Sequence, residues 1–245
     1  MNNAGSFDWS ALDRDLIAGM LCLTAPVTVN KTLSTTDLTK NVRKLFGYFG
    51  IPIMVRTTYH KETESKAVWV GGLYDSVKDK KRQKSISILL QFHPETSEIK
   101  LRSPGFKRMC YSIADTVLHE VIHMRQYRRR NFKDIPGYES TANYGAQRTE
   151  QIYLGHNDEI DAYAFNIACQ LMSRFDHDKK KVIQYLNSDL SDRRKKKDTF
   201  KMYLNVFDHD HDHTVIKKLK KKVVNYIPNA IEIGKPYRTT DWLKK

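Results

Sequence analysis

Two histidines and a glutamate in one short segment are the residues of this chain best suited to catalysis. The segment His119-Glu120-Val121-Ile122-His123 lies within an amphipathic run, residues 106–129, that predicts a helix. Because residues four apart project from the same face of a helix, both imidazoles can bind one metal ion. The segment therefore predicts a single Zn²⁺ per chain held by His119 and His123, with Glu120 as the general base that takes a proton from water.

A second helix downstream carries acidic candidates for a third ligand. Gly155 breaks the chain, Asn157 or Asp158 can cap the first free amides, and an apolar stripe follows. Glu159 lies in the first turn, beside Ala162, whose small side chain would allow another helix to approach closely. An acid in a first turn also stabilises a helix without any metal, so the position of Glu159 leaves both roles open.

These two segments resemble the gluzincin class of zinc metallopeptidases. In that class HExxH on one helix is completed by a glutamate on a second helix, often in an E-x-x-A context, which Glu159-Ile160-Asp161-Ala162 matches. The second segment is also similar to the Glu/Ala-rich helix of the ImmA/IrrE-type proteases and their phage relatives. The resemblance covers about residues 111–172. The metzincin class is excluded, because its pattern needs glycine and histidine where this chain has Gln126 and Arg129.

The resemblance implies a metallopeptidase whose third zinc ligand is Glu159. Asp161 is the alternative ligand, since aspartate replaces glutamate in related sites, and His156 comes after it. Tyr153 or His156 could instead stabilise the oxyanion that forms when water attacks a carbonyl. The chain departs from thermolysin-like enzymes at Tyr163, where they carry an aspartate that orients a histidine, so another group must orient His119.

The periodicities before the histidines predict an α+β fold. They indicate a helix at 37–49, strands at 53–60, 67–74 and 85–92, and a short strand at 98–102. We expect a zincin-like core: a small, mostly antiparallel sheet packed on the HExxH helix and a second ligand-bearing helix. Residues 128–156 read as a long polar connection between the two helices. The resemblance implies a protein or peptide substrate that pairs in extended form with an edge strand.

Charge divides the chain into regions. Lysine and arginine number 42 against 28 acidic residues, a net charge of +14, and residues 176–245 hold 18 of these cations and 10 acids. We expect an N-terminal arm at 1–30, a catalytic domain at 31–175 and a basic helical extension at 176–245. The tetrapeptide Phe-Asp-His-Asp occurs at 175–178 and again at 207–210, where a His/Asp tract that could bind transition metals follows.

The basic extension supports an alternative function. The protein could be a nucleic-acid-binding protein whose zincin domain is degenerate or secondary, since a basic surface attracts phosphates. Tyr185, Tyr203, Tyr226 and Tyr237 lie among the lysines and could stack on bases, or could equally be core residues.

The cysteines and the N-terminal segment point to the cytosol. Cys22, Cys110 and Cys169 are odd in number and widely spaced, which fits reduced thiols better than a disulfide framework. The first residues lack a basic segment typical of secretion signals, and the apolar stretch 16–27 is too short to cross a bilayer. We expect a cytoplasmic protein without a membrane partner, of bacterial or bacteriophage origin, acting in the host cytoplasm if a phage encodes it.

Overall fold

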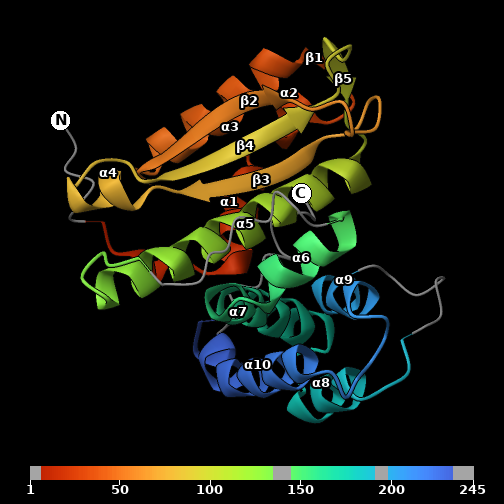
Figure 1. The fold of residues 1–245 in the computed structure, drawn as a ribbon. Helices are drawn as coiled ribbons and strands as arrows, with labels where there is room; N and C mark the ends of the chain where they lie inside the picture. The colour runs from red at the N-terminus through yellow and green to blue at the C-terminus, as the bar shows by residue number, and fades with distance from the viewer. Residues whose placement is uncertain (1–6, 135–144, 191–197, 234–245) are drawn as a thin grey trace. The chain divides into compact units, whose positions relative to one another are not determined.

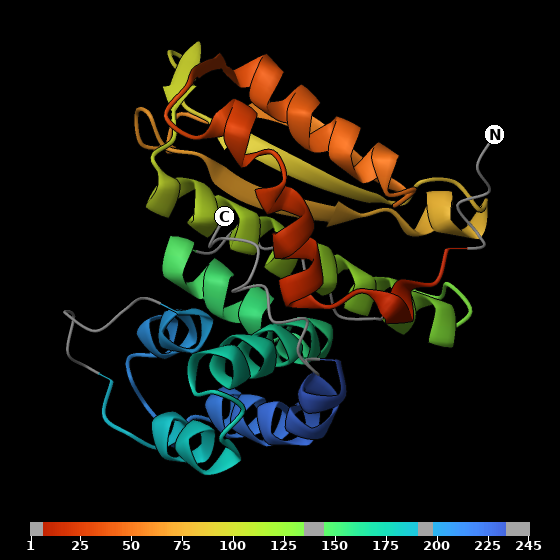
Figure 2. The same cartoon turned by 180° about the vertical axis from the view of Figure 1, so that it is seen from behind.

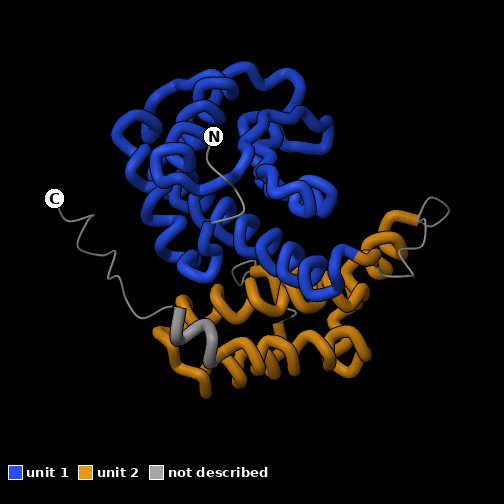
Figure 3. Tube along the Cα trace, turned by 90° about the vertical axis from the view of Figure 1, so that its left-hand side faces the viewer, with its two compact units in different colours: residues 1–132, 236–245 blue, residues 133–235 orange. Residues whose placement is uncertain are grey.

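The computed structural model describes residues 7–134, 145–190 and 198–233, and it has an α+β fold. The described residues up to Phe132 form one compact unit, and those from Lys133 onward form another (Figure 3). The domain boundaries expected after residues 30 and 175 stay a prediction. Among the helices of these ranges, none combines the length and the apolar character that crossing a membrane requires.

The first unit joins a small sheet to several helices (Figure 1). Its elements are η2 (Trp9–Ala11), α1 (Arg14–Cys22), α2 (Ala25–Thr28), β1 (Thr32–Ser34), α3 (Thr35–Tyr48), β2 (Ile53–Tyr59), β3 (Trp69–Tyr74), α4 (Ser76–Lys80), β4 (Ile86–Phe92), β5 (Glu98–Lys100) and α5 (Ser103–Arg129). The predicted helix, the four predicted strands and the histidine-bearing helix are therefore confirmed, each within a few residues. The helices α1, α2 and α4 and the strand β1 were not predicted.

The main sheet is mixed, so the expectation of a mostly antiparallel sheet is only partly right. Its strand order is β2-β4-β3, with β4 parallel to β2 and antiparallel to β3, while β1 and β5 form a separate antiparallel pair. Strand β4 takes the centre because its side chains Ile86, Ile88, Leu90 and Phe92 are the most apolar and have no exposed surface. The less apolar strands β2 and β3 are left at the edges.

Helices α3 and α5 pack against the same face of this sheet. The hydroxyl groups of Thr39 in α3 and Thr57 in β2 lie 2.7 Å apart, and α5 lies against β3 and β4. Figure 2 shows α3 and α1 in front of the sheet when the molecule is turned around. Arg14 links α1 to α5 through hydrogen bonds of 2.5 and 3.2 Å to Asp115. The histidine-bearing helix is thus fixed by the sheet and by α1.

The second unit is helical over its described residues. It contains α6 (Ala146–Gly155), α7 (Asn157–Arg174), α8 (Lys179–Leu186), α9 (Thr199–Val206) and α10 (Thr214–Ile233), with α7 packed along α10. Helix α6 occupies the end of the stretch that was predicted as a connection at 128–156; residues 135–144 of that stretch lie outside the described ranges. The predicted second helix is confirmed as α7.

The repeated tetrapeptide Phe-Asp-His-Asp forms the same turn in both places. Asp176 and His177 have φ angles of 55° and 63°, and Asp208 and His209 have φ angles of 54° and 57°. In both copies the histidine N–H donates to the carbonyl five residues earlier, at 2.8 and 2.7 Å. This left-handed ending with its long hydrogen bond closes α7 and α9 alike. The sequence repeat is therefore a structural repeat, and the start of the His/Asp tract belongs to a turn.

The tyrosines of the basic extension contribute to packing. Tyr203 is fully buried, Tyr226 packs edge-on against another aromatic ring, and Tyr185 donates a hydrogen bond to Asp198. Tyr237 lies outside the described residues. Because the three described rings are engaged within the unit, they give no support to base stacking, and binding of nucleic acid stays a prediction.

Candidate metal centre

Helix α5 is anchored at its carboxyl end by an ion pair. Arg128 donates two hydrogen bonds to Asp79, at 2.8 and 2.6 Å, and Asp79 also accepts one from the Tyr74 hydroxyl at 2.9 Å. Asp79 is buried and lies in α4, between β3 and β4. A paired, hydrogen-bonded carboxylate of this kind fixes geometry because separating it would leave an uncompensated buried charge. The ion pair therefore fixes the last turns of α5 against the sheet.

Two imidazoles converge on the face of α5 that is buried. His119 Nε2 and His123 Nε2 lie 3.0 Å apart, and the two ring planes meet at 80°. Nitrogen ligands of tetrahedral zinc, with bonds of about 2.0–2.1 Å, lie about 3.3 Å apart. A small rotation of either ring would reach that separation. His119 is buried and His123 half-buried, so the pair has the arrangement that one shared metal ion requires.

Gln126 sets the protonation of one of these rings. Its Oε1 lies 2.9 Å from His123 Nδ1. An amide oxygen only accepts, so Nδ1 carries the proton and Nε2 keeps its lone pair for a metal. Gln126 was not predicted as a site residue, because in the sequence it serves only to exclude the metzincin class. The signal was its position three residues after His123, on the same helix face.

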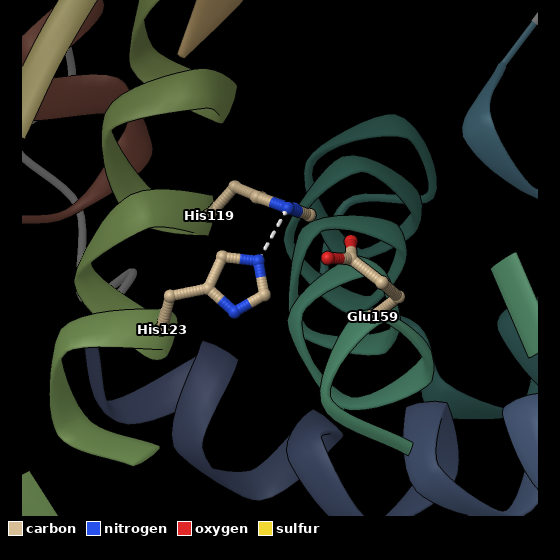
Figure 4. A group of neighbouring side chains, drawn as sticks. All are labelled: His119, His123 and Glu159. Carbon is tan, nitrogen blue, oxygen red and sulfur yellow. Dashed lines mark hydrogen bonds between the residues drawn. The ribbon is translucent and has the colours of Figure 1, made fainter. Parts of the chain in front are cut away.

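A carboxylate completes the group. The ligand atoms of His119, His123 and Glu159 all lie within 4.8 Å of one another, and Figure 4 shows the two rings and the carboxylate turned toward one another. Glu159 is buried in the first turn of α7. The cap of α7 is His156, whose Nδ1 accepts from the Asp158 N–H at 3.4 Å, and not Asn157 or Asp158 as the sequence suggested. These three side chains could hold a metal ion.

The other predicted site residues have different surroundings. Asp161 accepts a hydrogen bond of 2.6 Å from Lys222 in α10, and His156 caps α7, so neither belongs to the group of three. Tyr153 lies in α6 with 40% of its surface exposed, and its role in stabilising an oxyanion stays a prediction. Tyr163 packs edge-on against an aromatic ring of α9. Within the described residues, the His/Asp tract brings no such group together.

Glu120 lies against the backbone of the edge strand β3. A Cβ atom added to Gly72 would overlap Glu120 Oε1 and lie 2.6 Å from the Thr116 methyl group. Only glycine allows α5 to approach β3 this closely. Gly72 was not predicted as a site residue, because nothing local to residues 69–74 shows which helix faces them. The close contact places the predicted general base against the face of β3, which is an edge strand of the sheet.

The donor set determines which metals are suitable. Two imidazole nitrogens and one carboxylate oxygen, with room for water, form the set of many catalytic zinc sites and also of Fe(II) sites. His119 and Glu159 are both buried, and imidazole nitrogen and carboxylate oxygen are ligands that divalent metals bind. The residues therefore fit a divalent metal, whose identity the donor set alone does not decide.

Comparisons with known proteins give no family for this chain: no family model, no curated protein and no solved structure matches it. The similarity to gluzincins and to ImmA/IrrE-type proteases rests on the motif residues alone.

Replacing Gln126 by alanine should weaken metal binding without removing a ligand. Loss of the acceptor at Nδ1 frees the His123 ring to rotate and to change tautomer, so zinc affinity should fall about 10-fold to 100-fold. Gln126→Glu, which keeps an acceptor there, should bind zinc at least as tightly as the parent. Competition with a chromophoric chelator measures both affinities. Equal affinities for the parent and Gln126→Ala would contradict the orienting role.

Proposed function

We propose that this protein is a zinc-dependent peptidase. The observation that carries the proposal is the group formed by His119, His123 and Glu159, with Glu120 adjacent in sequence and placed against an edge strand. The gluzincin resemblance adds the expectation that such a group hydrolyses peptide bonds. In this assignment the two histidines and Glu159 are the zinc ligands.

Each of the site residues has a separate role in the proposed reaction. A bound zinc ion would polarise the scissile carbonyl and lower the pKa of a coordinated water towards about 7. Glu120 accepts a proton from the water that attacks the carbonyl carbon and returns it to the leaving nitrogen. Its location beside Gly72 limits the directions in which its carboxylate can move. Gln126 keeps His123 in the tautomer that can bind the metal.

Strand β3 is suited to holding the substrate. Among the described strands it pairs with β4 alone, which makes it an edge strand of its sheet. An extended peptide could add to that open edge through backbone hydrogen bonds, which recognise any sequence. Because Gly72 of β3 lies against Glu120, a peptide bound there would pass close to the general base. This geometry supports a polypeptide substrate in extended form.

Glu120→Gln tests the role of the general base. The amide is nearly the same size but cannot accept the proton, so kcat on an unfolded protein such as reduced casein should fall about 10²-fold to 10⁴-fold. Zinc affinity should be unchanged, because Glu120 is not a ligand. A variant as active as the parent would exclude this role, and a variant that lost zinc would place Glu120 in the metal site.

Gly72→Ala should affect activity through the position of Glu120. The added methyl group has to displace the Glu120 carboxylate or the strand, so hydrolysis should drop at least about tenfold while zinc stays bound. Gly71→Ala is the matched control on the same strand, since the closest contact of its Cβ would be the movable end of the Gln91 side chain, at 2.9 Å. Similar activities for the two variants would contradict the importance of this contact.

The assignment of the third ligand predicts an order of effects. Glu159→Ala removes a ligand and should lower zinc affinity more than about 100-fold, whereas Asp161→Ala should lower it about tenfold or less. Asp161 serves as control because it lies two residues away and pairs with Lys222. Chelator competition on both proteins gives the affinities. If the Asp161 variant loses zinc and the Glu159 variant keeps it, Asp161 is the ligand.

A further inference from the structure

A cavity with a strongly positive lining lies in the first unit. Its volume is about 670 Å³. The lining residues come from three segments: 66–69, which leads into β3; 100–102, at the end of β5; and 104–112, in the first turns of α5. None of the residues described so far as metal ligands or as general base lines it. The cavity is thus separate from the candidate metal centre.

Among the residues that the structure describes, four cations line this cavity and no acid does. They are Lys66, Lys100, Arg102 and Arg108, all exposed. The ion pairs between described residues all involve other cations. No carboxylate of a described residue therefore neutralises these four charges. Like charges gathered in a concave surface focus a positive potential. The amino end of α5, which has no side-chain cap, adds to it. The cavity should therefore attract an anionic group.

The walls of the cavity favour an acid carried on a polypeptide. Trp69 is 44% exposed, and Leu101 and Met109 line the same cavity. A free inorganic anion would leave this apolar surface in contact with water. A glutamate side chain and its neighbours would instead cover it with methylene groups while the carboxylate meets the cations.

The cavity and Glu120 lie along the same two elements. Strand β3 runs from Trp69 at the cavity to Gly72 beside Glu120, about 10 Å at the rise of an extended strand. Helix α5 runs from Ser112 at the cavity to Glu120, about 12 Å at the rise of an α-helix. A chain extended along β3 would therefore have one residue near Glu120 and another, about three or four positions away, over the cavity.

We propose that this cavity recognises acidic side chains of the substrate, about three or four positions from the bond that is cut. The proposal rests on the peptidase function proposed above and adds a substrate class: polypeptides with a cluster of aspartate or glutamate beside the cleavage site. The strongly basic composition of the whole chain agrees with acidic partners.

Binding of paired peptides tests the proposal. Two fluorescein-labelled synthetic peptides of equal length, one with a run of glutamates and one with glutamines in their place, are titrated with zinc-loaded Glu120→Gln protein. Fluorescence anisotropy should show about tenfold tighter binding of the glutamate peptide, decreasing with added salt. The additional double change Arg102→Glu and Arg108→Glu should remove this preference.

A matched control distinguishes the effect of the cavity cations from the effect of the protein's net charge. Lys107→Glu and Arg129→Glu alter the same helix by the same charge, and neither residue lines the cavity. The control should keep the preference. Equal losses in the two double variants, or no preference in the parent, would overturn the proposal. So would tighter binding of a single-stranded oligodeoxynucleotide that also depends on Arg102 and Arg108 while the two peptides bind alike. Thermal unfolding by circular dichroism checks that both variants are folded.

Hydrolysis of the same peptides distinguishes this proposal from the peptidase function. If the zinc-loaded parent cuts both peptides at the same rate, the cavity assignment is overturned and the peptidase function stands. If cavity-dependent binding is found and neither peptide is cut, the peptidase function is contradicted and the site for acidic peptides stands.

Discussion

The convergence of two imidazole nitrogens across one turn of α5 is the interaction on which the rest of this structure depends. It exists only while α5 is regular and fixed in rotation, because turning the helix would carry both rings away from their buried position. The sheet, the Arg14–Asp115 pair and the Arg128–Asp79 pair hold that rotation from different sides. Gln126 holds one nitrogen of the His123 ring, and a bound metal would hold the Nε2 atoms of both rings.

A second constraint is the close approach of α5 to β3. Gly72 permits it, and the Glu120 carboxylate occupies the space that a side chain would have filled. The basic cavity, the general base and the histidines therefore follow one another along α5, and the first two also follow one another along β3. The basic cavity lies where β3 and α5 begin, and the general base and the histidines follow further along. Substrate selection and chemistry can be linked in this way without any large movement of the fold.

Much of the local structure could be predicted from the sequence, because helices, strands and the spacing of His119 and His123 are properties of neighbouring residues. Strand order could not, since the parallel pairing of β2 with β4 follows from which strand is the most apolar in the whole sheet. Gly72 was missed because its importance comes from a helix more than forty residues later in the chain. The cap of α7 was misplaced because Asn157 is a commoner capping residue than His156.

The central claim is that two imidazoles and a carboxylate of this chain hold one zinc ion. Zinc K-edge X-ray absorption of the zinc-loaded full-length protein tests it most directly. We predict nitrogen and oxygen ligands at about 2.0–2.1 Å, with the multiple scattering of two imidazole rings and no sulfur. A sulfur shell at about 2.3 Å, or a spectrum without imidazole scattering, would contradict it.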